Sequence, residues 1–256
     1  MMKLCYDLLN LFASILSFIL SQMTRETKRI LFTRTLNADQ IEFGLKMDCL
    51  IDHHAFIRVD LCEIKRNHLD LINSGQYPNW IFTSQNAVRS LQANQKDIEL
   101  EKMQNCFAVG QKTADKLKEI GISAKIPKRH SAEGLSELLK DMSDESFLYF
   151  TGNLRQKTLI HFFEEHESPY KELKVYDTHL IQPEINLDHY DAICFCSPSA
   201  VHSFFKNYQL KNNQPCFAIG NTTAVSLVDY SDFVMLAEQT NVFSLIQSCN
   251  QYFIQS

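Results

Sequence analysis

The stretch CFAVGQKTADKL at residues 106–117 returns at residues 216–227 as CFAIGNTTAVSL, with seven of the twelve positions identical. A second matched pair lies upstream of each copy, where FTSQNAV at residues 82–88 parallels FCSPSAV at residues 195–201. The blocks occur in the same order in both halves of the chain, so we interpret them as an internal duplication. Chance similarity between unrelated units is the alternative, and two ordered blocks argue against it.

A weaker third pair extends the duplication toward the N-terminus, where ILFT at residues 30–33 matches LYFT at residues 148–151. Each unit has the same form, a short apolar run followed by an amphipathic segment. Trp80–Phe82 is such a run, and Ala87, Val88 and Leu91 then recur at helical spacing. Alternating apolar runs and helices are typical of βα units and a parallel sheet. The period of about 110 residues is too long for a solenoid and predicts two similar doubly wound α/β domains.

Composition narrows the class of protein. The chain has 256 residues, 45% of them hydrophobic and 21% charged, which suits a soluble globular protein of one large or two ordinary domains. Its net charge of −5 gives no reason to expect nucleic-acid binding. Eight cysteines are present without a CxxC pair, so we expect reduced thiols, a reducing compartment and no zinc site.

The N-terminal segment is apolar from Leu8 to Leu20 and has three explanations. It is short for a membrane span, which needs about 20 residues, and Ile19 occupies a position where a signal-peptidase site needs a small residue. We favour an extension, or a true start at Met23, over a peripheral membrane anchor or a secretory signal. We therefore expect no membrane partner.

Small or hydroxylic residues follow most of the predicted strands. In open parallel sheets ligands bind at the carboxyl ends of strands, and the helices that begin there offer free N–H groups to anions. Ordinary helix capping explains any one of these residues as well. Their arrangement in two facing sets predicts a cleft for a ligand with several negative groups. The residues at these ends are Thr33, Thr83, Ser84, Gly110, Thr151, Gly152, Ser197, Ser199 and Gly220.

Familiar catalytic motifs do not occur in the sequence. It has no GxSxG nucleophile motif, no Walker motif and no GxGxxG fingerprint. The nine histidines are scattered without a ligand spacing. We therefore predict neither a metal nor a nucleotide or other cofactor.

Taken together, the blocks resemble the uroporphyrinogen-III synthase family from Lys28 to Phe253. The specific part of the resemblance is FTGNLR followed by VYDT and then by SPSAV with AIGNTTA. The matching pieces are RILFTR (29–34), WIFTSQNAV (80–88), CFAVGQKTADKLKEIG (106–121), SAEGLSELL (131–139), FLYFTGNLRQKTL (147–159), LKVYDT (173–178), AICFCSPSAVHSFF (192–205) and CFAIGNTTAVSL (216–227).

The resemblance implies a domain organisation that the duplication alone does not. It implies an N-terminal extension over residues 1–27 and a discontinuous domain made of residues 28–61 and 179–256. Residues 62–178 would form the inserted second domain. Two extended crossover segments, about Phe56–Leu61 and Leu173–Ile181, would form a two-strand linker that permits domain closure.

The activity that the resemblance implies is a cofactor-independent hydro-lyase reaction in heme and tetrapyrrole biosynthesis. Hydroxymethylbilane loses its hydroxyl as water to give an azafulvene, and ring D then closes through a spiro intermediate and is inverted. Closure without an enzyme gives the type I isomer. Nothing in the sequence suggests oligomerisation, so we expect a monomer, and the expected reducing compartment is the cytoplasm. The activity also suggests a transient hand-over of substrate from hydroxymethylbilane synthase.

Tyr176 lies at the VYxT tyrosine of the family, which implies a role in protonating the departing hydroxyl. Cys196 departs from the threonine or serine that the family often has before its SP pair. The predicted substrate-binding residues, taken from the strand ends and the matching blocks, are Thr33, Arg34, Ser84, Asn86, Gly110, Thr113, Gly152, Asn153, Arg155, Ser197, Ser199, Gly220, Thr222 and Thr223.

Two alternative functions, both non-enzymatic, are also compatible with the duplicated domains. A non-catalytic bilobal protein that closes on an anionic ligand would explain the duplicated domains, but it predicts a cleaved signal peptide. A synthase-like domain that has lost activity and serves as a partner module is the second alternative. The intact GNLR, VYDT and GNTTA blocks argue against it.

Overall fold

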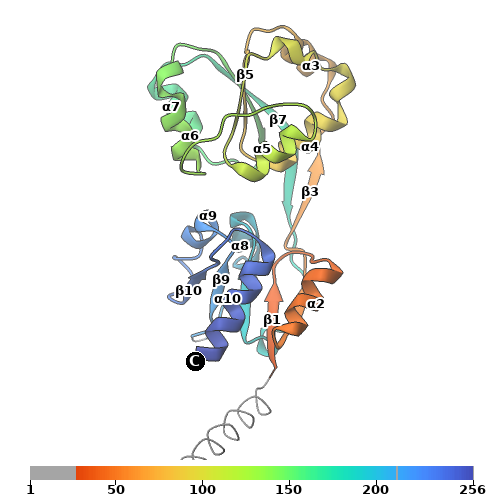
Figure 1. Ribbon diagram of the computed structural model, residues 1–256, viewed down its shortest axis with the longest axis vertical. Helices are drawn as coiled ribbons and strands as arrows, with labels where there is room; N and C mark the ends of the chain where they lie inside the picture. The colour runs from red at the N-terminus through yellow and green to blue at the C-terminus, as the bar shows by residue number, and fades with distance from the viewer. Residues whose placement is uncertain (1–26, 212, 256) are drawn as a thin grey trace, which may run out of the picture. The chain divides into compact units, whose positions relative to one another are not determined.

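A computed structural model describes residues 27–211 and 213–255, which form two compact units (Figure 1). The first unit contains the described residues up to His54 together with Glu184–Val201 and the described residues from Tyr208 onward. The second contains Ala55–Pro183 and His202–Asn207. Both units are therefore discontinuous in sequence, and the second consists mainly of the one stretch Ala55–Pro183.

The first unit is built on a parallel five-stranded sheet with the strand order β10-β9-β8-β1-β2. Between and after the strands lie four α-helices and one short 3₁₀ helix. The strands are β1 (Lys28–Phe32), β2 (Cys49–His53), β8 (Ala192–Phe195), β9 (Cys216–Ala218) and β10 (Val234–Leu236). The helices are α2 (Ala38–Lys46), η4 (Leu187–His189), α8 (Pro198–Phe204), α9 (Asn221–Val225) and α10 (Val242–Gln255).

Burial on both faces explains why the strands of this sheet read as continuous apolar runs. Ile30 and Phe32 face a core that α10 completes with Leu245 and Ile246. Leu31 alternates with them in β1 and is also fully buried. The first helix of the unit, α2, begins at Asn37, whose side chain forms a capping box with Gln40.

The second unit contains a sheet with the order β3-β7-β6-β4-β5, in which β3 alone runs antiparallel to its neighbour. The strands are β3 (Ile57–Leu61), β4 (Asn79–Phe82), β5 (Asn105–Ala108), β6 (Phe147–Gly152) and β7 (Tyr170–Leu180). The helices are α3 (Arg66–Asn73), α4 (Gln85–Ala93), η1 (Gln95–Asp97), η2 (Leu100–Lys102), α5 (Gln111–Lys118), α6 (Ala132–Leu139), η3 (Lys140–Met142) and α7 (Thr158–Glu165).

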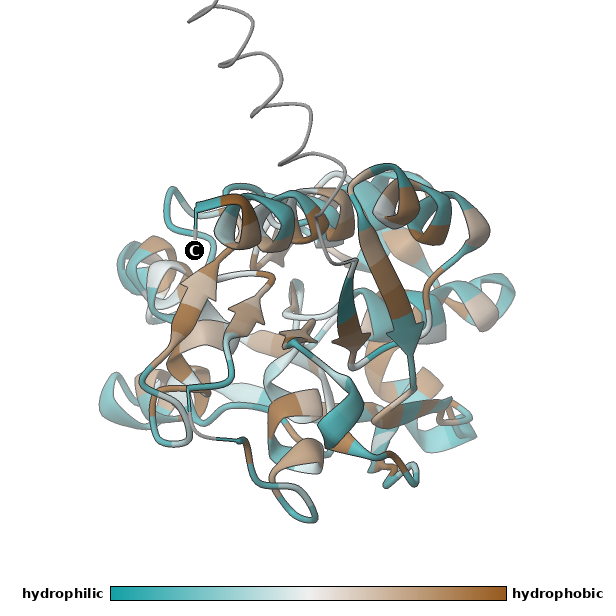
Figure 2. Cartoon of the chain, turned by 90° about the horizontal axis from the view of Figure 1, so that it is seen from below, coloured by the Kyte–Doolittle hydropathy of each residue, from teal (hydrophilic) through white to brown (hydrophobic). Residues whose placement is uncertain are grey.

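Helices cover both faces of the second sheet, so the prediction of a doubly wound α/β domain is confirmed. On one face Phe82 and Phe150 stack with ring centroids 4.5 Å apart, in a core shared with α4 and α5. On the other face Tyr149 and Phe147 pack against α6 and α7. The strands are coloured predominantly as hydrophobic in Figure 2, as expected for sheets that are buried on both sides.

The internal duplication maps onto both sheets in the same spatial order. By the matched sequence blocks, β1 corresponds to β6, β8 to β4 and β9 to β5. The first sheet contains the run β9-β8-β1-β2, and the second contains β5-β4-β6-β7. Each copy of the duplication therefore contributes strands to both sheets, and neither sheet is built from one contiguous half of the chain.

The two predicted crossover segments pair with each other. β3 runs antiparallel to the end of β7, with Ile57 opposite Leu180 and Leu61 opposite Tyr176. This pair forms one edge of the second sheet, and it brings the ends of the inserted stretch side by side.

The predicted N-terminal extension lies outside the described residues apart from Thr27. Within the described part of the chain, no helix combines the length and the apolar character needed to cross a bilayer.

The packing of α6 predicts an unusual response to substitution. Alanine in place of a helical glycine normally adds about 1 kcal/mol of stability. A Cβ on Gly134 would overlap the carbonyl oxygen of Arg129, so we expect Gly134→Ala to lower the free energy of unfolding by about 1–3 kcal/mol. The single tryptophan, Trp80, is fully buried in the same unit and reports its urea unfolding by fluorescence.

Ser136→Ala in the same helix is the matched control, because the Ser136 hydroxyl donates a hydrogen bond to the Ala132 carbonyl of the same helix. This control should be neutral or slightly stabilising. A Gly134→Ala protein as stable as the wild type would show that α6 does not pack against Arg129 as described.

Candidate active site

Each sheet reverses its winding between two central strands. In the second sheet the chain proceeds outward from β4 to β5 on one side and from β6 to β7 on the other. The loops after β4 and β6 therefore diverge at the carboxyl edge, which is where open α/β sheets bind ligands. Thr83 and Ser84 follow β4, while Gly152 ends β6 and Asn153 follows it. Three of the residues predicted at strand ends, together with the predicted binding residue Asn153, are thus brought to one switch point.

Tyr176 lies at this switch point because β7 carries an irregularity. The pairing of β6 with β7 shifts register between Thr151 and Gly152, so that Gly152 faces Tyr176. Bulges of this kind re-aim side chains and are frequent beside active sites. A Cβ on Gly152 would overlap the ring of Tyr176 and lie 2.9 Å from its hydroxyl oxygen. Only a glycine permits this close approach.

The hydroxyl of Tyr176 is held protonated at neutral pH. Burial of the half-buried ring raises the pKa of the phenol above its ordinary value of 10.0. A hydrogen bond with the Ser84 side chain lowers that pKa in part, and the neighbouring Tyr149 raises it. Ser84 also accepts a hydrogen bond from the Asn86 N–H at 3.1 Å, as the cap of α4. The phenol can therefore donate a proton to a group bound at this edge.

Two predicted binding residues in the loop after β6 already have hydrogen-bond or ion-pair partners within the second unit. The Asn153 side chain accepts from the Thr178 N–H at 2.7 Å and donates to the Thr178 carbonyl at 3.1 Å. Arg155 is paired with Glu172 through both Nε and Nη2, the latter at 2.9 Å from Oε1. These side chains fasten the loop after β6 to β7.

Tyr149 is a polar residue of the site that the sequence reasoning missed. It is 2% exposed, and its hydroxyl lies 3.1 Å from Thr83 Oγ1. Burial raises the pKa of this phenol above 10.0 as well. Its position inside an apolar run gave no signal beyond that of a core aromatic. The contact joins β6 to the end of β4 at the switch point.

The third loop at this edge follows β5. Gly110 is the N-cap of α5 in an extended conformation, and Thr113 in the first turn is 5% exposed. The N–H groups of Thr113 and Ala114 both donate to the Gly110 carbonyl. Thr113 therefore contributes mainly to packing, whereas the N-terminal end of α5 remains directed to the carboxyl edge.

The first sheet repeats the arrangement at its own switch point between β1 and β8. Thr33 is fully buried, and both its N–H and its hydroxyl donate to the Cys194 carbonyl at 3.0 Å. Arg34 is exposed, and its Nε donates to the Thr35 carbonyl. Ser197 caps α8 by accepting from the Ala200 N–H at 3.2 Å, and Ser199 is half-buried in the first turn. Thr33 thus ties the two central strands together.

Gly220 and its neighbours repeat the geometry of the β5 loop. Gly220 caps α9 with φ −172°, as Gly110 caps α5 with φ −176°. Thr223 is 2% exposed and occupies the place of Thr113, while Thr222 is exposed. The duplication therefore preserves a glycine N-cap and a buried threonine in both units.

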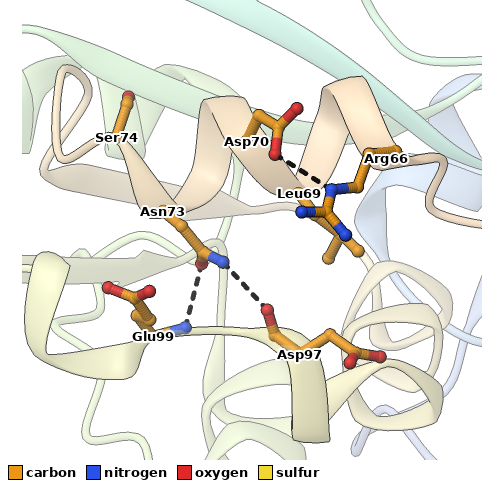
Figure 3. A pocket seen from close by; sticks show the side chains of 7 residues that line it. All are labelled: Arg66, Leu69, Asp70, Asn73, Ser74, Asp97 and Glu99. Atoms are coloured by element: carbon orange, nitrogen blue, oxygen red, sulfur yellow. Dashed lines mark hydrogen bonds and ion pairs between the residues drawn. The ribbon is translucent and has the colours of Figure 1, made fainter.

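A polar cavity of about 380 Å³ lies elsewhere in the second unit, between α3 and the segment of η1 and η2 (Figure 3). Asn73 spans it, donating to the Asp97 carbonyl and accepting from the Glu99 N–H. None of the predicted site residues lines it. Its lining residues are Arg66, Leu69, Asp70, Asn73, Ser74, Asp97 and Glu99.

No group of three or more His, Cys, Asp and Glu residues within residues 27–211 and 213–255 is arranged to hold a metal ion. The chemistry that the residues at the two switch points offer is proton donation by the half-buried phenol of Tyr176 and hydrogen bonding from serine hydroxyls and helix N-termini.

A family model described as uroporphyrinogen-III synthase HemD matches residues 56–247, three quarters of the chain. A search of the curated proteins gave no match.

Solved structures share the fold at low sequence identity. A mutant uroporphyrinogen III synthase from Thermus thermophilus matches with a TM-score of 0.72 at 17% identity, over 90% of this chain and 100% of that one. A uroporphyrinogen-III synthetase from Helicobacter pylori matches with a TM-score of 0.61 at 18% identity, over 88% of this chain and 99% of that one. A wild-type structure of the Thermus protein gives 0.55 at 19% identity, over 89% and 98%.

The close approach of Gly152 to Tyr176 predicts that a single methyl group displaces the phenol. Gly152→Ala should lower the rate of any reaction that uses Tyr176 by about 10–100-fold, because displacements near 1 Å have costs of this size. Steady-state turnover and circular dichroism of the purified variant measure the effect and the folding separately.

Leu154→Ala is the control in the same loop, since Leu154 is 51% exposed. It should retain wild-type turnover. A fully active Gly152→Ala enzyme would mean that the placement of Tyr176 against Gly152 does not matter to the chemistry.

Proposed function

The chain belongs to the uroporphyrinogen-III synthase family, and from this premise we propose how its residues carry out the reaction. The family makes the protein a lyase of heme and tetrapyrrole biosynthesis that converts hydroxymethylbilane to uroporphyrinogen III. The observation that carries the residue-level proposal is the half-buried Tyr176, held between Gly152 and Ser84 at a switch point of the second sheet.

In the proposed mechanism Tyr176 acts as the general acid. Its phenol donates a proton as the C–O bond of the hydroxymethyl group breaks, and the hydroxyl leaves as water. The azafulvene that remains is attacked by the substituted carbon of ring D, and the resulting spiro intermediate fragments and recloses with ring D inverted. The pyrrole carbon that forms the last bond loses its proton, which returns to the phenolate. The overall change is the loss of one water molecule.

Selection between the two closures is the harder task, and we assign it to binding. The substrate carries eight carboxylates, and we propose that they are met mainly by backbone N–H groups at the helix N-termini. The N-terminal ends of α4 and α5 lie at the carboxyl edge of the second sheet and suit negative groups. In the first unit the exposed Arg34 and the hydroxylic Ser197, Ser199 and Thr222 are proposed contacts. Holding one folded conformer favours the inverted product.

We further propose that the enzyme works without a cofactor, as a cytoplasmic monomer that receives its substrate by transient hand-over from hydroxymethylbilane synthase. The cysteines support a reducing location. The seven described cysteines are all free, and Cys194 Sγ lies 3.3 Å from Cys249 Sγ in a hydrogen bond between thiols. Burial raises the pKa of Cys49, Cys106 and Cys216 to about 12, so these thiols stay protonated and unreactive.

The ring-closing function is tested by a coupled assay. Hydroxymethylbilane is generated from porphobilinogen in the presence of the purified protein, and the oxidised product isomers are separated by chromatography. A predominance of the type III isomer is expected. Type I product at the spontaneous rate, from protein shown to be folded, would contradict the function and favour the bilobal binding protein.

The role of Tyr176 is tested by Tyr176→Phe, which removes the proton but keeps the ring against Gly152. We expect kcat for type III product to fall about tenfold or more. Thermal stability should change little, because the hydroxyl forms its hydrogen bond with Ser84 at the carboxyl edge of the sheet and not in the core. Tyr170→Phe is a control in the same strand, where the phenol lies at the opposite end. Full activity of Tyr176→Phe would remove this residue from the mechanism.

A further inference from the structure

The loop that follows β6 is joined to β7 by a side chain that imitates strand pairing. Asn153 lies just beyond the last residue of β6, where backbone pairing with β7 has ended at Gly152 and Tyr176. Its amide accepts from the N–H and donates to the carbonyl of Thr178, as the backbone of a neighbouring strand would. Both polar ends of the side chain are therefore engaged within the domain.

This connection lies directly beside the catalytic phenol. Thr178 is two residues beyond Tyr176 in β7, and Asn153 immediately follows the Gly152 that contacts the ring. The register shift just before Gly152 interrupts the regular ladder at this place. Beyond that shift, the two hydrogen bonds between Asn153 and Thr178 hold the loop at a fixed distance from β7. The Cα of Gly152 is thereby kept against the ring of Tyr176.

The other polar contact of the loop lies on the other face of the sheet. Arg155 pairs with Glu172, whose register partner in β6 is Tyr149. Tyr149 belongs to the core under α6 and α7, whereas Tyr176 packs with the core under α4 and α5. The Arg155–Glu172 pair therefore holds the loop without touching the face that carries Tyr176.

We propose that Asn153 is a positioning residue that acts through Tyr176, by fixing the Gly152 backbone against the phenol, and is not a ligand of the substrate. This inference rests on the proposed role of Tyr176 as the general acid. It gives Asn153 a different part from the substrate contact that the sequence motif suggested.

A double-mutant comparison tests the proposal. Asn153→Ala should lower kcat about tenfold with KM unchanged within about twofold, because a misplaced acid slows the chemical step without weakening binding. In a Tyr176→Phe background the same substitution should cost nothing further, since the group that it positions is gone. Asn153→Asp keeps the acceptor for the Thr178 N–H but sets a carboxylate oxygen against the Thr178 carbonyl, so it should not restore the activity.

Asn94→Ala is the matched control in the same domain. Asn94 donates one amide hydrogen bond to the Ser90 carbonyl at the far end of α4, and its loss should leave kcat and KM unchanged. A rise in KM for Asn153→Ala, or an equal loss of activity with and without Tyr176, would overturn the proposal in favour of direct substrate binding.

A measurement without substrate separates this proposal from the catalytic one. Titration of ring-labelled tyrosine by NMR, assigned with Tyr176→Phe, should show the Tyr176 pKa falling toward 10 in Asn153→Ala as the ring becomes hydrated. That fall together with a fully active Tyr176→Phe enzyme would support positioning by Asn153 and refute the acid role. An unchanged titration would refute positioning whatever the activity of Tyr176→Phe.

Discussion

Everything at the proposed site depends on the reversal of winding in each parallel sheet. Right-handed crossovers send the chain outward in opposite directions from a central pair of strands, β1 and β8 in one sheet and β4 and β6 in the other. In both sheets the two central strands come from different copies of the internal duplication. The junction between copies is therefore also the place where loops diverge, and open α/β sheets bind ligands at such a place.

At one of these junctions, small departures from regular structure place a proton donor. The register shift in β7 brings Tyr176 opposite Gly152, and the absence of a side chain there lets the phenol lie against the backbone. Ser84 meets the hydroxyl from the start of α4, and burial keeps it protonated. A substrate that ionises readily needs little more acid assistance than this, so we propose that the larger contribution of the protein is to hold the bilane in the conformer that inverts ring D.

The sequence was sufficient for the architecture and less so for the roles of side chains. The repeated CFA[VI]G blocks predicted two similar α/β domains with Gly110 and Gly220 at corresponding strand ends, because apolar runs and glycine reflect backbone structure directly. Thr33 and Asn153 are of residue types that often bind ligands, yet their side chains form hydrogen bonds with neighbouring strands. Strand register decides that outcome, and a one-residue shift such as the one before Gly152 has no sequence signature. The sequence did not identify Tyr149 as a polar residue of the site, because it lies within an apolar strand.

The most direct test of this account is a crystal structure of the protein with the macrocyclic product bound, prepared without oxygen. We expect the macrocycle at the carboxyl edge of the second sheet, with the phenol of Tyr176 against it and carboxylates at the N-terminal ends of α4 and α5. A macrocycle bound in the cavity lined by Arg66, Asp70 and Asn73, with Tyr176 uncovered, would contradict it.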